Sequence, residues 1–424
     1  MPDASARAPA TPPALSTRRL ALLLGGLAMF GPFSIDTIFP AFPAIGAQFG
    51  ADKLAMQQTI SVYLVAYAVM SLVHGPLSDA IGRRRVILAG LAVFTAASVG
   101  CALATDLPTL LFFRAIQGLS SGVGLIVGRA LIRDVLHGDD AQRLMSQVSM
   151  IFGIAPAIAP IIGGWILGVS RWPAIFWFLV AFGAALLAVA WRTLPETHPP
   201  SARSPLKARR LLRDYAAIAI NPRFQRLAAA SAFNFAALWV YIASAPAFVM
   251  DILRLNERQF GWFFVPMISG MVLGAFASGR MAGRFDAQRQ VGIGFACSAV
   301  AIAANLAYTL LVPVPTVPWA VLPMLLNAFG IGLVFPIITL AILDMYPHQR
   351  GAASSLQAFT SLVLNALIAG VLSPWLSTHA LWLVASAMVF LMLGFAFWRW
   401  ELHACRRMQR TTLGASPAVP EESL

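Results

Sequence analysis

Long apolar segments dominate the chain, and short polar segments separate them. Each apolar segment is close to the roughly 20 residues that a helix needs to cross the hydrocarbon core of a bilayer. Alternation of apolar and polar residues is absent, which argues against barrel strands and favours helices, whose backbone groups pair internally. Twelve such segments cover residues 20–44, 57–74, 86–104, 107–132, 144–167, 173–191, 227–250, 260–279, 291–312, 317–343, 355–376 and 381–398.

A polar interval rich in Pro, Ser and Arg divides these segments into two groups of six. The expected fold is therefore an all-α membrane protein with 12 transmembrane helices in two pseudo-symmetric six-helix bundles. The stretch GPLSDAIGRRR after the second segment is echoed by GRMAGRFDAQR after the eighth, as in a parallel internal repeat. The expected organisation is an N-terminal tail (1–19), a bundle (20–191), a linker (192–226), a second bundle (227–400) and a C-terminal tail (401–424).

Composition supports a membrane protein, because 59% of the residues are hydrophobic and only 11% are charged, against about 25% charged in soluble domains. The net charge of +13 is spread over the loops and forms no single basic domain, so we expect no nucleic-acid partner. Of the 30 Lys and Arg residues, 25 fall in tails and loops on the same side of the membrane as the N-terminus. Because Lys and Arg are enriched in cytoplasmic loops, this bias predicts that both termini are cytoplasmic. The first segment resembles a signal peptide after Arg18 and Arg19, but it is longer and contains Asp36, so we interpret it as a retained helix.

Two charges lie well inside the predicted spans. Asp36 is the one carboxylate well within a span, and Arg114 lies in the fourth span. If the first span is one continuous helix, Asp36 lies about 12 Å from its end at Ala44, and Arg114 lies about 10 Å from the outer end of its own span. Intramembrane charges are functional by default, and a carboxylate near a cation can exchange a proton for a cationic substrate. The alternatives are a structural polar anchor for Asp36 and snorkelling of Arg114 to the surface.

The loop between the second and third spans carries a recognisable motif. Gly75, Asp79, Gly82 and Arg83 fall at the spacing of the G-x-L-x-D-r-x-G-r-r loop, and Arg114, Gln117 and Gly118 fit an R-x-x-q-G pattern. The chain resembles a major facilitator superfamily transporter over its whole hydrophobic length. The resemblance implies that the loop is a cytoplasmic gate; the alternative is an ordinary positively charged loop.

The fifth span reads GIAPAIAPIIGGW and resembles the antiporter motif of the same superfamily. Ala155 and Ala159 replace two of its glycines. The residues that remain predict a helix hinge with close packing, because prolines kink helices and small residues allow close approach. These hinge residues are Pro156, Pro160, Gly163 and Gly164.

Several short matches narrow the resemblance to the Bcr/CflA branch of drug:proton antiporters. They are PAFPAI after Asp36, LPET after span six, NPRF before span seven and YIASAPAFV within it. The resemblance implies export of small amphipathic drugs or metabolites by alternating access in exchange for protons. It also implies a monomer in a bacterial-type cytoplasmic (inner) membrane, without a cofactor.

Within this scheme Asp36 is the expected proton-coupling residue, and Arg114 is expected to tune its protonation and to contact substrate. Polar residues near the middle of the spans are further candidates for substrate contact, although each can equally bond a neighbouring helix. With Arg114, these candidates are Gln117, Tyr63, Tyr67, Asn234, Tyr241, Asn327 and Asn365.

Enzymatic signals are weak. The G-x-S-x-G match at Gly118 to Gly122 lies in the middle of a span, where helix packing explains the glycines better than a nucleophile elbow does. Neither lysine belongs to a G-K-[ST] loop, and the scattered histidines, with His74 near a helix end, show no metal-ligand spacing. We therefore expect neither an enzymatic activity nor a metal site. The alternatives to efflux are a proton-coupled importer of a metabolite and a non-transporting membrane sensor or scaffold.

Overall fold

In the computed structural model, which describes residues 17–136, 138–203, 206–281, 284–347 and 349–414, helices account for all of the regular secondary structure. The parts of the predicted tails before residue 17 and after residue 414 lie outside the described residues. The chain divides into two compact units, Met1–Lys207 with Val249–Ile268, and Ala208–Phe248 with Ser269–Leu424. The boundary after Lys207 falls inside the expected linker.

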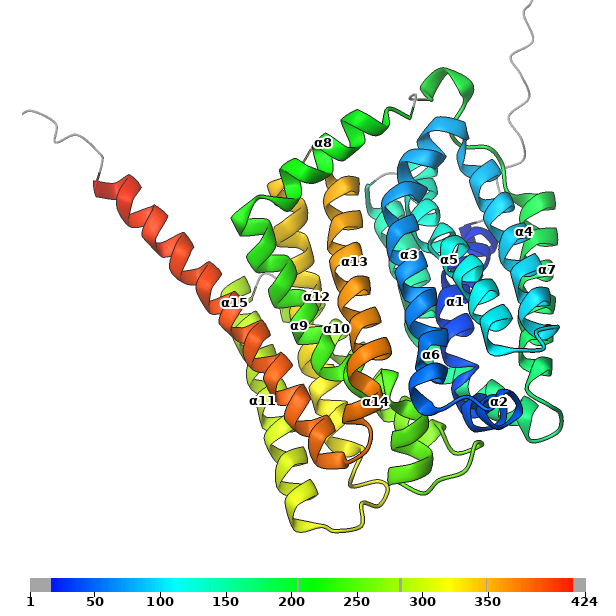
Figure 1. Ribbon diagram of the computed structural model, residues 1–424. Helices are drawn as coiled ribbons and strands as arrows, with labels where there is room; N and C mark the ends of the chain where they lie inside the picture. Colours follow the sequence, from blue (N-terminus) through cyan, green and yellow to red (C-terminus); the bar gives the residue numbers. More distant parts are fainter. Residues whose placement is uncertain (1–16, 137, 204–205, 282–283, 348, 415–424) are drawn as a thin grey trace, which may run out of the picture. The chain divides into compact units, whose positions relative to one another are not determined.

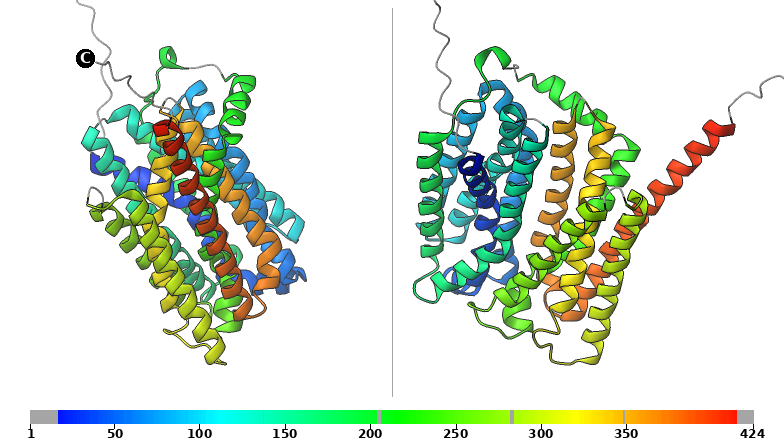
Figure 2. Two further views of the ribbon diagram at one scale, coloured as in Figure 1. Left: turned by 90° about the vertical axis from the view of Figure 1, so that its left-hand side faces the viewer. Right: turned by 180° about the vertical axis from the view of Figure 1, so that it is seen from behind.

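Unit 1 contains α1 (Thr17–Asp36), η1 (Phe39–Ala41), α2 (Phe42–Phe49), α3 (Lys53–Ile81), α4 (Arg83–Ala102), α5 (Leu107–Val135), α6 (Gly138–Leu167), α7 (Pro173–Thr193) and η2 (Pro200–Ala202). Unit 2 contains α8 (Ala208–Ala219), α9 (Pro222–Ala243), α11 (Ala287–Leu311), α12 (Leu322–Met345), α13 (Arg350–Leu367), η4 (Ile368–Leu372), α14 (Ser373–Leu376) and α15 (Ala380–Gly414). The segments η3 (Ala247–Ile252) and α10 (Gly261–Met281) each contribute residues to both units. Within unit 2, α15 extends beyond the helices beside it (Figures 1 and 2).

The predicted spans are helical. Within the described residues, 11 helical segments are long and apolar enough to cross a membrane, and the apolar part of α6, Ile151–Leu167, is a shorter one. These segments correspond one by one to the twelve spans expected from the sequence. The expected linker also contains α8, a helix that the Pro- and Arg-rich composition of the linker did not predict.

The first span is not one continuous helix, which corrects the depth expected for Asp36. The helix α1 ends at Asp36, and η1 and α2 follow. Pro40 has no amide proton for the carbonyl of Asp36, four residues earlier, and its ring disfavours helical geometry there. Asp36 therefore lies at a helix terminus within the span, and its depth cannot be counted along a helix to Ala44.

Close approach of helices in unit 1 depends on glycines of α5. A side chain at Gly118 would collide with the carbonyl of Tyr63 on α3, and one at Gly124 would collide with the carbonyl of Leu27 on α1. The packing interpretation of this glycine-rich stretch is therefore confirmed. Because α3 and α1 both approach α5 closely, their polar side chains meet around the middle of α5.

Candidate functional site

Asp36 lies in the interior of unit 1. The residue is 4% exposed. Within the described part of the chain, its carboxylate has no hydrogen-bond donor and no ion-pair partner, although it interacts electrostatically with Arg114. A buried carboxylate that lacks such partners is unusual, because an ionised group in this position is not compensated by direct bonds. This group is therefore suited to taking up and releasing a proton.

Arg114 is fully buried on α5 and connects three helices. Its Nη1 donates to the carbonyl and to the hydroxyl of Ser34 on α1, at 2.9 Å in both cases. Its Nε donates to the carbonyl of Thr59 on α3 at 3.2 Å. The snorkelling alternative is therefore wrong, since the guanidinium is held inside the unit. Its Nη2 is buried without a partner among the described residues.

Two further predicted residues contact Arg114. Gln117 Oε1 accepts a hydrogen bond from Arg114 Nη1 at 2.8 Å, and Gln117 Nε2 donates to Ser98 Oγ at 2.8 Å. The guanidinium carbon lies 4.5 Å from the ring centroid of Tyr63, a cation–π geometry. The hydroxyl of Tyr63 bonds Ser121. Tyr67 lies one turn further along α3 and is half-buried.

The structure thus brings Asp36, Arg114, Gln117 and Tyr63 together in one cluster of unit 1. Sequence reasoning missed Ser34, which lies two residues before Asp36, and also missed Ser98 and Ser121. Serine is common in transmembrane helices, so its residue type alone gave no signal. The Thr59 contact uses a backbone carbonyl, which no residue type predicts.

The predicted residues of unit 2 are buried there. Tyr241 accepts a hydrogen bond from Asn305 Nδ2 at 2.7 Å, so its hydroxyl has a partner on another helix. The amide oxygens of Asn234, Asn327 and Asn365 are buried and have no partner among the described residues. Buried polar atoms are nearly always bonded, so these three oxygens are open to a ligand or to water.

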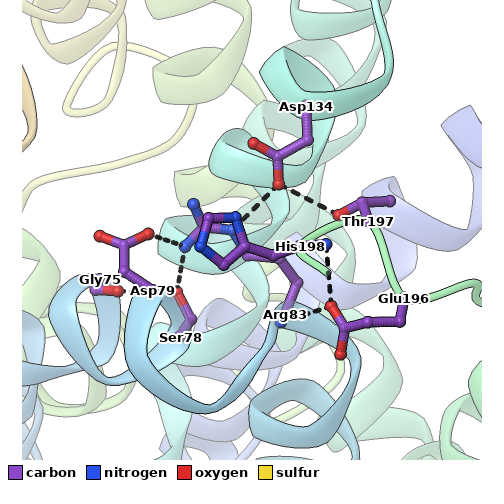
Figure 3. A network of polar contacts seen from close by, with 8 residues as sticks. All are labelled: Gly75, Ser78, Asp79, Arg83, Asp134, Glu196, Thr197 and His198. Carbon is purple, nitrogen blue, oxygen red and sulfur yellow. Dashed lines mark hydrogen bonds and ion pairs between the residues drawn. The ribbon is translucent and has the colours of Figure 1, made fainter. Parts of the chain in front are cut away.

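The loop motif forms a polar network at the end of α3 (Figure 3). The Arg83 guanidinium bonds Asp79 and the hydroxyl of Ser78 on one side, and Asp134 of α5 at 3.1 Å on the other. The hydroxyl of Ser78 also donates to the carbonyl of Gly75 at 2.7 Å. The motif therefore fastens α3, α4 and α5 together through a largely buried arginine.

A second acidic residue completes this network. Glu196, after α7, accepts from the backbone amide of Arg83 at 2.9 Å. Gly82 has φ +107°, and a side chain there would collide with Glu196. Thr197 donates to Asp134 at 3.1 Å. Sequence reasoning noted Glu196 only as part of LPET and missed Asp134, because neither lies at a fixed spacing from the loop motif.

The predicted hinge residues lie on α6, which stays helical through Pro156 and Pro160. A side chain at Gly163 would collide with the carbonyl of Thr37, the residue after Asp36. One at Gly164 would collide with the carbonyl of Glu257. These two glycines therefore let α6 contact the break in α1 on one side and the segment Val249–Ile268 on the other.

The segment Val249–Ile268 is tied to the rest of unit 1 by two polar contacts. Lys53 at the start of α3 pairs with Asp251 at 2.6 Å, and Arg258 Nη2 donates to the carbonyl of Gly168 at 2.9 Å. Both contacts are exposed. Lys53 and Arg258 are among the few basic residues that the charge bias predicts on the outer side, so these contacts lie at the predicted outer end of the unit.

Within the described residues, no group of three or more His, Cys, Asp or Glu side chains is arranged to hold a metal ion. The candidate site is therefore the buried polar cluster around Arg114 and Asp36, with the Arg83 network on the same unit. This arrangement can bind and release a proton, and it offers an unpaired donor on Arg114.

The sequence matches the Major Facilitator Superfamily over residues 22–366 and again over residues 227–412. It is 27% identical to a bicyclomycin resistance protein homolog of Haemophilus influenzae over 66% of this chain and 71% of that protein. It is 28% identical to multidrug resistance protein D of Escherichia coli over 80% of this chain and 84% of that protein.

The fold also has a solved counterpart. A bacterial homolog of the human lysosomal transporter Spinster superposes with a TM-score of 0.70 at 17% identity, covering 92% of this chain and 98% of that one. This likeness concerns the fold alone. Together with the spanning helices, the family match over most of the chain establishes that this multi-pass membrane protein belongs to the Major Facilitator Superfamily.

Proposed function

We propose that the protein exports small amphipathic drugs or metabolites in exchange for protons, by alternating access. Membership of a transporter family and the similarity to relatives named for bicyclomycin and multidrug resistance support this function. One observation carries the proton-coupling part. Asp36 is buried without a bonding partner beside the fully buried Arg114.

Asp36 acts as the protonation switch in this proposal. The ionised carboxylate favours substrate binding, and the protonated carboxyl favours release, because two positive partners cannot occupy one buried acid at the same time. Arg114 tunes this exchange through its charge and offers its unpaired Nη2 to substrate. Gln117 and Tyr63 hold the guanidinium in place, and Tyr67, Asn234, Tyr241, Asn327 and Asn365 are the proposed further substrate contacts.

In this proposal the helix α6 couples protonation of Asp36 to the conformational change. The carbonyl of Thr37 rests on Gly163, so a change at the neighbouring Asp36 reaches α6 by direct contact. Gly164 then contacts Glu257, in the segment held by the Lys53–Asp251 ion pair. In this proposal Pro156, Pro160, Gly163 and Gly164 form the hinge, and the network of Gly75, Asp79, Gly82 and Arg83 forms the cytoplasmic gate.

The proposed location is a bacterial cytoplasmic membrane, with both termini on the cytoplasmic side and a monomer as the working unit. The distribution of Lys and Arg supports the orientation. It places the Arg83 network on the cytoplasmic side and Lys53 on the outer side.

Everted membrane vesicles with an acidic lumen test this function, with the fluorescent cation ethidium as the cargo. We expect proton-driven accumulation by the wild type and by Asp106→Asn, an exposed helix cap that Asn can replace. We expect loss of accumulation in Asp36→Asn. Ethidium movement out of the lumen would favour an importer, and the absence of any proton-driven movement of ethidium or bicyclomycin would favour a sensor or scaffold.

A further inference from the structure

A buried histidine lies between the two polar sites of unit 1. His74 belongs to α3, 11 residues after Tyr63 and nine before Arg83. Along a helix these positions place His74 about 16 Å from Tyr63, and about 10 Å from the end of α3 at Ile81. The apolar segment 57–74 predicted a helix end at this residue, whereas α3 continues for two more turns, to Ile81.

The environment of His74 leaves one ring nitrogen free. The residue is 3% exposed, and its Nδ1 is buried without a partner among the described residues. The ring lies against the main chain of Leu119 on α5. In the neutral tautomer with its proton on Nε2, Nδ1 carries the lone pair. The neutral ring therefore holds its Nδ1 lone pair ready to accept a proton.

Packing fixes the direction of this lone pair. A Cβ placed on Gly122 of α5 would lie 2.9 Å from His74 Nδ1 and 2.8 Å from Tyr67 Cε2. Nδ1 and Tyr67 thus face the same point on α5. Tyr63, Tyr67 and His74 are spaced by four and seven residues, so they share one face of α3. This face runs from the Arg114 cluster toward the Arg83 network.

The charged and titratable groups around His74 include no acid that would hold it protonated. Tyr67 lies on its own helix, and Arg129 of α5 interacts electrostatically with Tyr67. Within the described residues, no carboxylate pairs with the imidazole. A purely structural histidine would be expected to use both nitrogens, because an unsatisfied buried acceptor lowers the stability of the fold.

We propose that His74 is the proton-transfer residue on the cytoplasmic side of Asp36. The proton that leaves the Asp36 carboxyl is accepted at His74 Nδ1, through water admitted from the cytoplasmic side, and gives an imidazolium. The imidazolium then releases it to the cytoplasm, and the neutral ring is restored. This inference rests on the proposed function, because it assigns the exit route of the exchanged proton.

The test is the dependence of ethidium accumulation on the outside pH in everted vesicles, with luminal pH fixed. His74→Asn keeps a hydrogen-bonding side chain but cannot carry the proton. The matched control is His379→Asn, which makes the same substitution at an exposed histidine. The two variants are compared at each pH, where they experience the same driving force. We expect the ratio of their initial rates to fall to about a tenth as the outside pH rises, because only the neutral imidazole can accept the proton and Asn cannot replace it. Ethidium affinity should stay unchanged.

A ratio that stays constant from an outside pH acidic enough to protonate the imidazole up to about pH 8 would overturn the proposal, whether the variant is fully active or uniformly impaired. His74→Gln provides a second variant if His74→Asn fails to fold, and the same ratio is measured. Failure of the proposed function is a different result, because the His379→Asn control itself would then show no proton-driven accumulation.

Discussion

At the scale of single residues, Arg114 is the best-connected side chain of the candidate site. Its guanidinium satisfies acceptors on Ser34, Thr59 and Gln117 at the same time. We expect Arg114→Lys to lower the melting temperature of the purified protein, because an ammonium cannot reproduce this planar set of donors. Each buried acceptor left unpaired destabilises the fold by about 1–3 kcal/mol.

Arg171→Lys is the control for this prediction, since the side chain of Arg171 is exposed. Thermal unfolding followed by fluorescence in detergent compares the two variants with the wild type. Equal melting temperatures for all three proteins would contradict the connecting role of Arg114.

Much of the site could be predicted at this scale. Asp36 and Arg114 were found because charge inside an apolar span is rare and nearly always has a role. The partners of Arg114 could not be found in the same way. Two of them are backbone carbonyls, of Ser34 and Thr59, and their positions depend on how closely α1 and α3 approach α5. His74 was misjudged for a related reason, because its environment is set by α5.

At the scale of helices, glycine contacts decide which elements can approach each other. Gly124 of α5 touches the backbone of Leu27, whereas the nearest atom to a Cβ at Gly128 is Leu24 Cδ2 at 3.6 Å, an ordinary contact. We expect Gly124→Ala to destabilise the protein by about 1–3 kcal/mol through overpacking. Gly128→Ala should be close to neutral in the same unfolding experiment. Similar losses in both variants would argue against the close contact of α1 and α5.

The proposed hinge on α6 allows an equally matched comparison between two glycine variants. Gly163 contacts the backbone of Thr37, whereas a side chain at Gly153 of the same helix would meet nothing within 4 Å. We expect Gly163→Ala to reduce ethidium transport at least about tenfold, because it displaces the break that carries Asp36. Gly153→Ala should transport normally. Normal transport by a folded Gly163→Ala variant would remove α6 from the proposed coupling route.

The break in α1 shows how far helix patterns could be read from sequence. The apolar segment 20–44 is continuous, so hydropathy alone predicted one helix. Pro40 and Pro43 are visible in the sequence, but prolines are tolerated within membrane helices, as α6 demonstrates at Pro156 and Pro160. Packing against neighbouring helices decides whether a proline breaks a helix, as after α1, or is accommodated within it, as in α6. The helix α8 was missed because its short, arginine-rich sequence lacks a spanning apolar core.

At the scale of the whole molecule, the sequence predicted the class and the spans, because bilayer length and charge bias act along the entire chain. The family was predicted from the resemblance of its loop and span motifs. The same bias predicts that both termini are cytoplasmic. A green fluorescent protein fused to the C-terminus should therefore fluoresce, and an alkaline phosphatase fused there should be inactive. The opposite pair of results would invert the orientation and would place the Arg83 network on the outer face.

The central claim is that Asp36 exchanges its proton for cargo, and proton release by the purified protein tests it most directly. Ethidium is added to the wild type and to Asp36→Asn in weakly buffered detergent solution containing a pH-sensitive dye. The account predicts that the wild type releases protons on binding, and that Asp36→Asn, which mimics the protonated carboxyl, binds ethidium more weakly and releases no protons. Undiminished proton release by Asp36→Asn would contradict it.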